Sequence, residues 1–157
     1  MIGRRAATLI FTVSCVAMAS SEIGAQPKPT PQLNYEFYKA RVEPIFLKKK
    51  DGHTRCVVCH SESNNFLRLE PLEKGANGQV AKTWTDEQSR KNFDAVSKLV
   101  NPGQPMVSRL LMHPLAPEGG GDVFHSGGRQ FASTKDPDWK AMAEWVNGAT
   151  LGGSKKN

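Results

Sequence analysis

Cys56-Val57-Val58-Cys59-His60 is the segment from which the fold of this 157-residue chain can be predicted. Two cysteines separated by two residues and followed directly by a histidine form the attachment pattern of a c-type haem. Each thiol can form a thioether with one haem vinyl group, while the histidine reaches the iron. The motif therefore predicts one covalent haem c bound through Cys56 and Cys59, with His60 as an axial ligand of the iron.

Two other uses of a CxxC pair have less support in the sequence. The third cysteine, Cys15, lies in a segment that we expect to be removed, so only Cys56 and Cys59 remain to pair. A thioredoxin-like redox disulfide belongs to a βαβ pattern, which does not surround this motif. A zinc site needs four ligands, usually supplied by a second CxxC or an HxxxH pair, and the sequence contains neither.

Residues 1–25 have the pattern of a secretory signal peptide. Arg4 and Arg5 precede an apolar run over residues 6–16, which is too short for a permanent membrane-spanning helix. An Ala-Met-Ala cleavage pattern follows at residues 17–19. We therefore expect a protein that is periplasmic or otherwise exported from a bacterial cell, with no transmembrane helix in its mature chain.

The charge of the chain is moderately basic. The formal net charge is +6, and removal of residues 1–25 with their two arginines and one glutamate leaves +5. No nucleic-acid-binding motif accompanies this charge, so we expect no nucleic-acid partner. A soluble basic surface explains it, and docking to an acidic redox partner is the alternative, with Lys48-Lys49-Lys50 as the densest cluster.

The rest of the chain divides into a Pro-rich linker (26–33), one domain (34–150) and a disordered tail (151–157). The first helix should begin after Asn34, a favourable N-cap residue, and Pro44 should kink or divide it. Apolar residues recur along this helix at helical spacing, which indicates a buried face. These residues are Tyr35, Tyr38, Val42, Ile45 and Phe46.

Three further helices are predicted after the motif. Thr85 and Gln88 form a capping box for the second, whose apolar face extends to Val100. A short helix begins at Pro105 and ends before Pro114. The last helix is capped by Asp136, has Pro137 in its first turn and ends just before Gly148. Between the motif and Thr85, two short extended pieces on either side of Asn77-Gly78 leave room for a small β-hairpin insertion.

This order of elements resembles that of a small class I cytochrome c, in which a helix precedes CxxCH and a terminal helix packs across the first. A closer resemblance is to planctomycete-type cytochrome c modules, and it spans about residues 35–150. It rests on residues 101–105 (Asn-Pro-Gly-Gln-Pro), 108–111 (Ser-Arg-Leu-Leu) and 145–149 (Trp-Val-Asn-Gly-Ala). The resemblance implies an all-α, class I cytochrome c-like fold with three to five helices around one haem.

The sequence departs from this family at the sixth iron ligand. Related modules carry Met-Pro-Pro after the Ser-x-Leu-Leu segment, whereas this chain has His125 in a glycine-rich stretch and no Met-Pro pair. We therefore expect His125 as the second axial ligand. His113, a methionine such as Met106 or Met112, and an open position remain alternatives.

A covalent haem with two axial ligands predicts a one-electron carrier rather than an enzyme. Its partners would be redox proteins, among them a larger oxidoreductase or a respiratory or photosynthetic complex. The alternative is a peroxidase-like haem enzyme or a gas-binding sensor, which requires an open or displaceable sixth position. Phe37, Phe46, Phe93, Leu110, Leu111 and Trp139 are the residues expected in the wall of the haem pocket.

Overall fold

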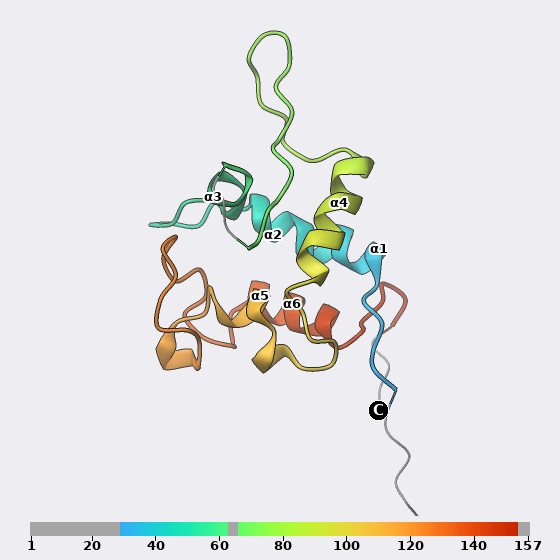
Figure 1. Cartoon of the computed structure of the whole chain (residues 1–157), viewed down its shortest axis with the longest axis vertical. Coiled ribbons are helices and arrows are strands. Elements are labelled where there is room, and N and C mark those ends of the chain that lie inside the picture. Colours follow the sequence, from blue (N-terminus) through green and yellow to red (C-terminus); the bar gives the residue numbers. More distant parts are fainter. Residues whose placement is uncertain (1–28, 63–65, 154–157) are drawn as a thin grey trace, which may run out of the picture.

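The computed structural model describes residues 29–62 and 66–153, and within them the regular structure is helical. The helical segments in chain order are α1 (Tyr35–Phe37), the π-helical turn η1 (Tyr38–Val42), α2 (Glu43–Leu47), α3 (Cys56–Glu62), α4 (Asp86–Ser97), the 3₁₀ turn η2 (Pro105–Val107), α5 (Arg109–Met112), the 3₁₀ turn η3 (Pro117–Gly119) and α6 (Pro137–Val146). Figure 1 shows α1 and α2 crossing the middle of the molecule, with α3 and α4 above them and α5 and α6 below. The prediction of an all-α protein is confirmed.

The first helix begins and is interrupted where the sequence predicts. The side chain of Asn34 accepts a hydrogen bond from the amide of Phe37 at 2.8 Å and caps α1. Pro44 lies in the first turn of α2, directly after the π-helical turn. Proline has no amide hydrogen, and its ring collides with the carbonyl four residues earlier, which here belongs to Ala40. The wider π-helical turn accommodates the proline ring, so the helical path continues from α1 through η1 into α2.

The caps of the later helices also follow the sequence, but one predicted end is wrong. Thr85 and Gln88 form the reciprocal capping box of α4, and the Asp136 carboxylate accepts from two amides at the start of α6. However, α4 ends at Ser97 rather than near Val100. The carbonyl of Leu99 accepts the amide of Leu110 at 3.0 Å, so the chain leaves the helix to join α5.

The core is centred where α6 lies across η1. Tyr38, Phe93 and Trp145 form an aromatic cluster there, with ring centroids 5.3 to 5.9 Å apart in edge-to-face or tilted arrangements. Such pairs add to the free energy gained by burying the rings. The indole nitrogen of Trp145 donates to the carbonyl of Asn34 at 3.0 Å, which ties the last helix to the start of the first.

The predicted β-hairpin insertion is replaced by an irregular projecting loop. One isolated bridge joins Lys74 and Val80, and no strand forms on either side of it in the described residues. The loop extends away from the helices at the top of Figure 1. Residues 73–80 are all exposed, so their side chains have no apolar surface against which a longer ladder could pack.

The predicted segments of the chain stay predictions, and two of them lie wholly or partly outside the described residues. The signal peptide 1–25 and residues 154–157 of the predicted tail lie outside the described residues. The described end of the predicted linker is packed on the domain: a Cβ added at Gly148 would lie 2.9 Å from Cβ of Pro31. Gly148 has φ of +82°, and its lack of a side chain permits this contact.

Glu43 is a buried carboxylate between α2 and α4, with 6% of its surface exposed. Its Oε1 accepts from the Ser89 hydroxyl at 3.0 Å, and Oε2 has no hydrogen-bond partner among the described residues. Burial raises the pKa of Glu43 above its ordinary value. The folded state therefore holds the proton to a higher pH than the unfolded state does.

Replacing Glu43 with glutamine should stabilise the fold at neutral pH. The native protein loses stability as the pH rises from the unfolded pKa through the raised folded pKa, and a neutral amide avoids this loss. The gain in unfolding free energy should therefore be largest near pH 7 and vanish below about pH 4, where both states are protonated. Urea unfolding of both proteins at several pH values measures it. A Glu43→Gln variant that is less stable than the native protein at pH 7 would contradict this account.

Candidate functional site

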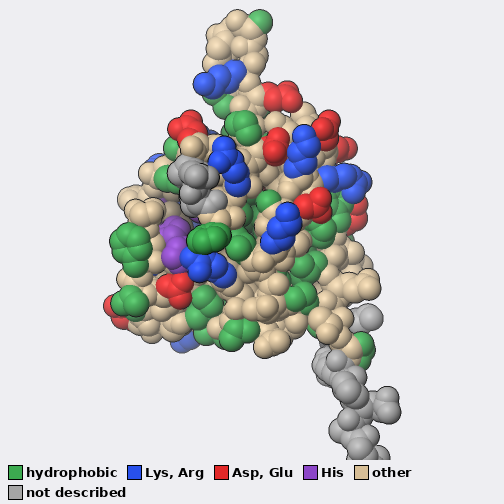
Figure 2. All heavy atoms as spheres, in the orientation of Figure 1, with side chains coloured by type: hydrophobic (Ala, Val, Ile, Leu, Met, Phe, Trp, Pro, Cys, Tyr) green, Lys and Arg blue, Asp and Glu red, His purple; other side chains and the backbone are tan. Residues whose placement is uncertain are grey.

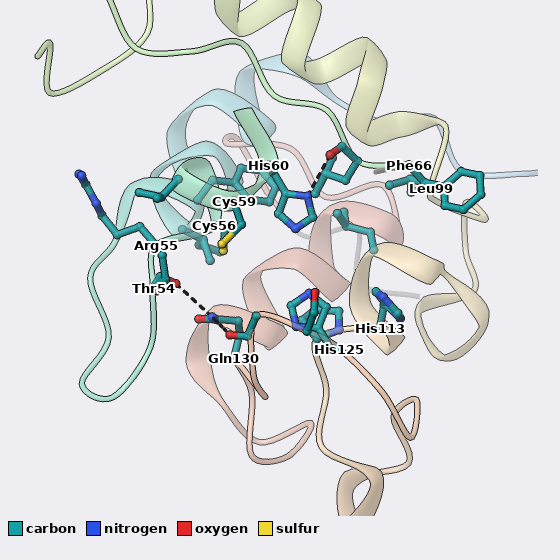
Figure 3. A pocket seen from close by; sticks show the side chains of 18 of the residues that line it. Thr54, Arg55, Cys56, Cys59, His60, Phe66, Leu99, His113, His125 and Gln130 are labelled. Carbon is teal, nitrogen blue, oxygen red and sulfur yellow. Dashed lines mark hydrogen bonds between the residues drawn. The ribbon is translucent and has the colours of Figure 1, made fainter. Parts of the chain in front are cut away.

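A cavity of about 550 Å³ lies between α3 and the segments that carry His113 and His125. This volume is within the range of pockets that hold cofactors, about 300–1,000 Å³. Most of its wall is apolar, and charged, neutral polar, histidine and cysteine side chains complete it (Figure 3). The apolar lining consists of Ile45, Phe46, Val58, Phe66, Leu67, Leu99, Leu110, Pro114, Phe131 and Met142.

The composition of this wall corrects the sequence-based expectation. Of the six side chains predicted to form it, only Phe46 and Leu110 line the cavity. The other four, Phe37, Phe93, Leu111 and Trp139, belong to the core or to its edge and do not reach the cavity. Helical spacing identified these residues as apolar and inward-facing, but it does not say which side of a helix faces core and which faces the cavity.

His60 lies near the end of α3 and is oriented by the chain that follows it. Its Nδ1–H donates to the carbonyl of Leu67 at 2.9 Å, and the amide of Leu69 donates to the carbonyl of His60 at 2.9 Å. The neutral ring then carries its lone pair on Nε2. This is the arrangement in which protein histidines bind a metal, because the outer hydrogen bond fixes both the tautomer and the ring orientation.

The segment that holds His60 is anchored in turn to α4. The amide of Glu70 donates to the side chain of Asn92 at 2.7 Å, and the indole of Trp84 donates to the carbonyl of Glu70 at 2.7 Å. Asn92 is 1% exposed. From the sequence we expected only short extended pieces in this stretch, so its role in orienting His60 was missed.

Cys56 and Cys59 lie on the same wall of the cavity as His60 (Figure 3). No disulfide bond joins them. Burial raises the pKa of the Cys56 thiol to about 11, so at neutral pH this group is a protonated thiol. The reactive cysteines of thioredoxin-like motifs have lowered pKa values, and Cys56 differs from them in direction.

His125 comes from the glycine-rich segment on the opposite wall. Its Nδ1–H donates to the carbonyl of Gly128 at 2.6 Å, and the amide of Gly128 donates back to the carbonyl of His125 at 3.0 Å. The partial burial of the ring lowers the pKa of His125, which favours the neutral imidazole that metal binding requires. Nδ1 of His125 therefore donates to a backbone carbonyl, as Nδ1 of His60 does.

The rings of His60 and His125 face each other across the cavity, as Figure 3 shows. Their centroids are 6.3 Å apart and their planes differ by 21°. Two imidazoles on opposite sides of one metal, each with a bond of about 2.0–2.1 Å, have ring centres roughly 6 Å apart. The centroid separation of this pair therefore matches the spacing of two axial ligands of one metal.

His113 is the third histidine of the cavity. Its ring centroid lies 5.0 Å from that of His125, edge to face, and its Nδ1 pairs with Oδ2 of Asp122 at 2.8 Å. It therefore lies beside the predicted sixth ligand rather than opposite His60. His53, in contrast, donates Nδ1–H to the carbonyl of Asp51 at 2.9 Å and lies outside the cavity lining.

The methionines weighed as alternative ligands do not line the cavity. Met106 and Met112 are absent from its wall, and Met106 is 47% exposed. Met142, on α6, is 2% exposed and does line it. Helical spacing alone puts Met142 on the buried face of α6 but does not indicate that this part of the face borders the cavity.

Comparisons of the sequence with protein-family models, curated proteins and solved structures found no match. In the described part of the chain, no helix is both long and apolar enough to span a membrane. What the fold and the site define is a helical protein with a cofactor-sized cavity, lined by both cysteines and the histidine of the CxxCH motif and by two further histidines.

Gly128 should be needed for the position of His125. Its φ is +82°, and an added Cβ would lie 3.3 Å from Cδ2 of His53. Gly128→Ala should lower the unfolding free energy by about 1–2 kcal/mol because an L-residue is strained in this conformation. If His125 binds a metal, the substitution should also weaken that ligation, which visible spectra report.

Gly78→Ala is the matched control for that substitution. Gly78 has a φ of +77° and open space around its Cα, and it lies in the projecting loop. Its replacement should carry a similar backbone cost and leave the spectrum unchanged. Equal spectra for the two variants would remove the role assigned to Gly128.

Proposed function

We propose that this chain is a single-haem c-type cytochrome with a class I-like fold that acts, outside the cytoplasm, as a one-electron carrier. The observation that supports the proposal best is the pair of imidazoles, His60 and His125, at 6.3 Å on opposite sides of a cavity that Cys56 and Cys59 also line. A haem bound there would supply reversible one-electron transfer. No substrate bond needs to be made or broken by the protein.

Each residue of the motif has a separate role in this proposal. Cys56 and Cys59 would tether the porphyrin edge through thioether bonds. His60 would bind the iron through Nε2 while Leu67 holds its Nδ1–H. A porphyrin brings four equatorial nitrogens of its own, so the protein needs to supply only two axial ligands.

His125 would occupy the second axial position and keep other ligands away from it. Its hydrogen bond with Gly128 fixes the ring, so little movement is required when the charge of the site changes. Histidine in place of a methionine ligand stabilises the ferric state and should lower the reduction potential. The apolar wall opposes this effect because it disfavours the additional ferric charge.

The charged side chains of the cavity support a haem rather than a fully apolar ligand. Arg55 and Arg109 both line it, together with one acidic residue, Glu62. Haem carries two propionate groups, and guanidinium groups are well suited to binding carboxylates. Figure 2 shows histidine side chains at the surface of this face, with apolar and basic side chains around them. The site therefore has an accessible edge through which a redox partner protein, free or part of a larger oxidoreductase, can exchange electrons.

The second candidate function is a haem enzyme or gas sensor with a displaceable sixth ligand. The observation in its favour is His113, which lies beside His125 and is oriented by Asp122. A histidine held in this way above an open iron position can act as a general acid or base. This candidate requires that His125 leave the iron under working conditions.

Carbon monoxide separates the two candidates. The natively exported protein should have a low-spin spectrum in both oxidation states, and the reduced protein should resist carbon monoxide because His125 fills the sixth position. Rapid and complete binding of carbon monoxide would favour the enzyme or sensor. The measurement needs only visible absorption spectra before and after addition of the gas.

A further inference from the structure

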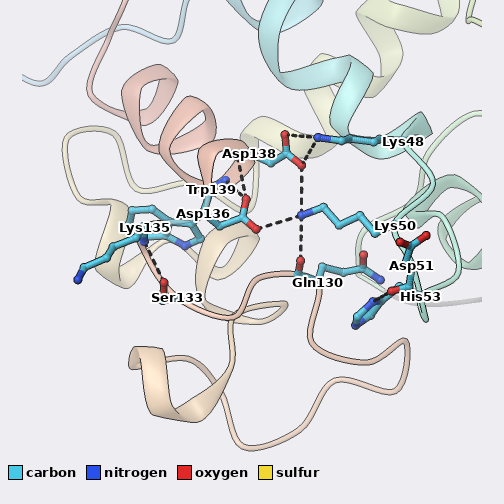
Figure 4. A network of polar contacts seen from close by, with 10 residues as sticks. All are labelled: Lys48, Lys50, Asp51, His53, Gln130, Ser133, Lys135, Asp136, Asp138 and Trp139. Carbon is cyan, nitrogen blue, oxygen red and sulfur yellow. Dashed lines mark hydrogen bonds and ion pairs between the residues drawn. The ribbon is translucent and has the colours of Figure 1, made fainter.

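The two walls of the cavity are joined by polar contacts that the proposed function does not use. One wall includes Thr54 and Arg55, which end the segment 48–55 and lead directly into α3 with Cys56 and His60. The other includes the segment His125–Phe131. Figure 4 shows Lys50 reaching from the first segment to Gln130 in the second.

Gln130 is the centre of these contacts. It is 9% exposed, and its Nε2 donates to the carbonyl of Thr54 at 3.2 Å and to the carbonyl of Gly127 at 3.3 Å. Thr54 is two residues before Cys56, and Gly127 is two residues after His125. One amide group therefore connects the chain beside the first cysteine of the motif with the chain beside the second histidine, as the dashed line in Figure 3 indicates.

Lys50 strengthens the same connection from its other side. Its Nζ donates to the carbonyl of Gln130 at 2.9 Å and forms ion pairs with Asp136 at 3.4 Å and Asp138 at 3.1 Å. The ammonium also lies 4.4 Å from the ring centre of Phe131. The Lys50 side chain is 19% exposed, so its contacts are partly shielded from water. They therefore contribute more to the stability of the fold than ion pairs on the surface do.

We infer that Lys50 and Gln130 form a latch, by which we mean a pair of side chains that joins the two walls of the cavity. This latch holds His125 in its place opposite His60, where it can bind the iron. Both are positioning residues: they act through the backbone of residues 127–130 and through Thr54, and neither is proposed to bind the iron. The inference rests on the proposed function, because the latch matters for ligation only if His125 is an axial ligand. Without the latch, the two walls can separate and His125 can leave the iron more often.

Lys50→Met and Gln130→Leu test the latch in the natively exported protein. Each removes the hydrogen bonds and keeps a side chain of similar size. We expect the reduced variants to bind carbon monoxide about tenfold faster than the native protein, since each loses a hydrogen bond or two from the closed state. The ferric proteins should gain a high-spin band, and Lys50→Arg, which keeps a cation and donors, should largely restore the native spectrum.

Lys48→Met is the matched control. Lys48 also pairs with Asp138, at 3.0 Å, but it makes no contact with Gln130. A general loss of stability would affect Lys48→Met and Lys50→Met alike, and thermal unfolding measures that loss. Carbon monoxide rates that change equally in these two variants, or that stay at the native value in Gln130→Leu, would overturn the inference and leave the proposed function standing.

Hydrogen exchange provides a readout that does not depend on haem. Amides of the His125–Phe131 segment should exchange faster in Lys50→Met and Gln130→Leu than in the native protein or in Lys48→Met. Unchanged exchange would overturn the latch whether or not haem is present. If the native protein itself is high-spin or binds carbon monoxide freely, the ligand role of His125 fails, and the latch as a holder of that ligand fails with it.

Discussion

His125→Ala should convert a low-spin haem protein that resists carbon monoxide into one that binds it readily. The side chain fills the position opposite His60, and its removal leaves space there for water or a gas. Visible spectra of the exported variant should show a high-spin ferric form, and the reduced form should bind carbon monoxide almost completely. Added imidazole should restore the low-spin spectrum by occupying the space that the deletion creates.

Two further variants identify the ligand without ambiguity. His53→Ala removes a histidine that lies outside the cavity and should keep the native spectrum. His113→Ala should also remain low-spin, because His113 lies beside His125 rather than opposite His60. A high-spin His113→Ala protein together with a low-spin His125→Ala protein would assign the ligand to His113.

Replacement of both Cys56 and Cys59 by alanine should nearly abolish haem-containing protein. Covalent attachment needs both thiols, and without them a haem would be retained only through bonds between its iron and histidine side chains. The haem content per polypeptide of the exported protein, measured after denaturation, should fall by about tenfold or more because thioether attachment is what survives unfolding. Denaturation of the native protein, in contrast, should leave its haem attached.

Val58→Ala is the control for this change. Val58 lies within the same motif and borders the cavity, but it offers no thiol. Its variant should keep the native haem content. If the double cysteine variant retained as much denaturation-resistant haem as the native protein, attachment through Cys56 and Cys59 would be excluded.

Local sequence signals predicted the helix ends well because these depend on neighbouring residues. Asn34, the Thr85–Gln88 pair and Asp136 cap helices as expected, since each satisfies amides within its own first turn. The early end of α4 could not be predicted in this way. It depends on a hydrogen bond between Leu99 and Leu110, which are eleven positions apart in the sequence with two prolines between them.

The site was predicted in part for the same reason. The spacing of the CxxCH motif places Cys56, Cys59 and His60 on one wall without knowledge of the fold. We predicted His125 as a ligand because the sequence lacks the Met-Pro motif of related modules. In the structure, the ring centroids of His125 and His60 are 6.3 Å apart. Gln130 carries no signal that a single sequence reveals, because its importance comes from two carbonyl groups, one of them 76 residues away.

The most direct test of the central claim is the mass and the pyridine haemochrome spectrum of the protein exported by a host that matures c-type cytochromes. We predict a polypeptide carrying the mass of one haem, which remains after denaturation, and the haemochrome spectrum of a porphyrin whose two vinyl groups have become thioethers. Fully matured protein with the mass of the bare polypeptide and no haemochrome would contradict the account.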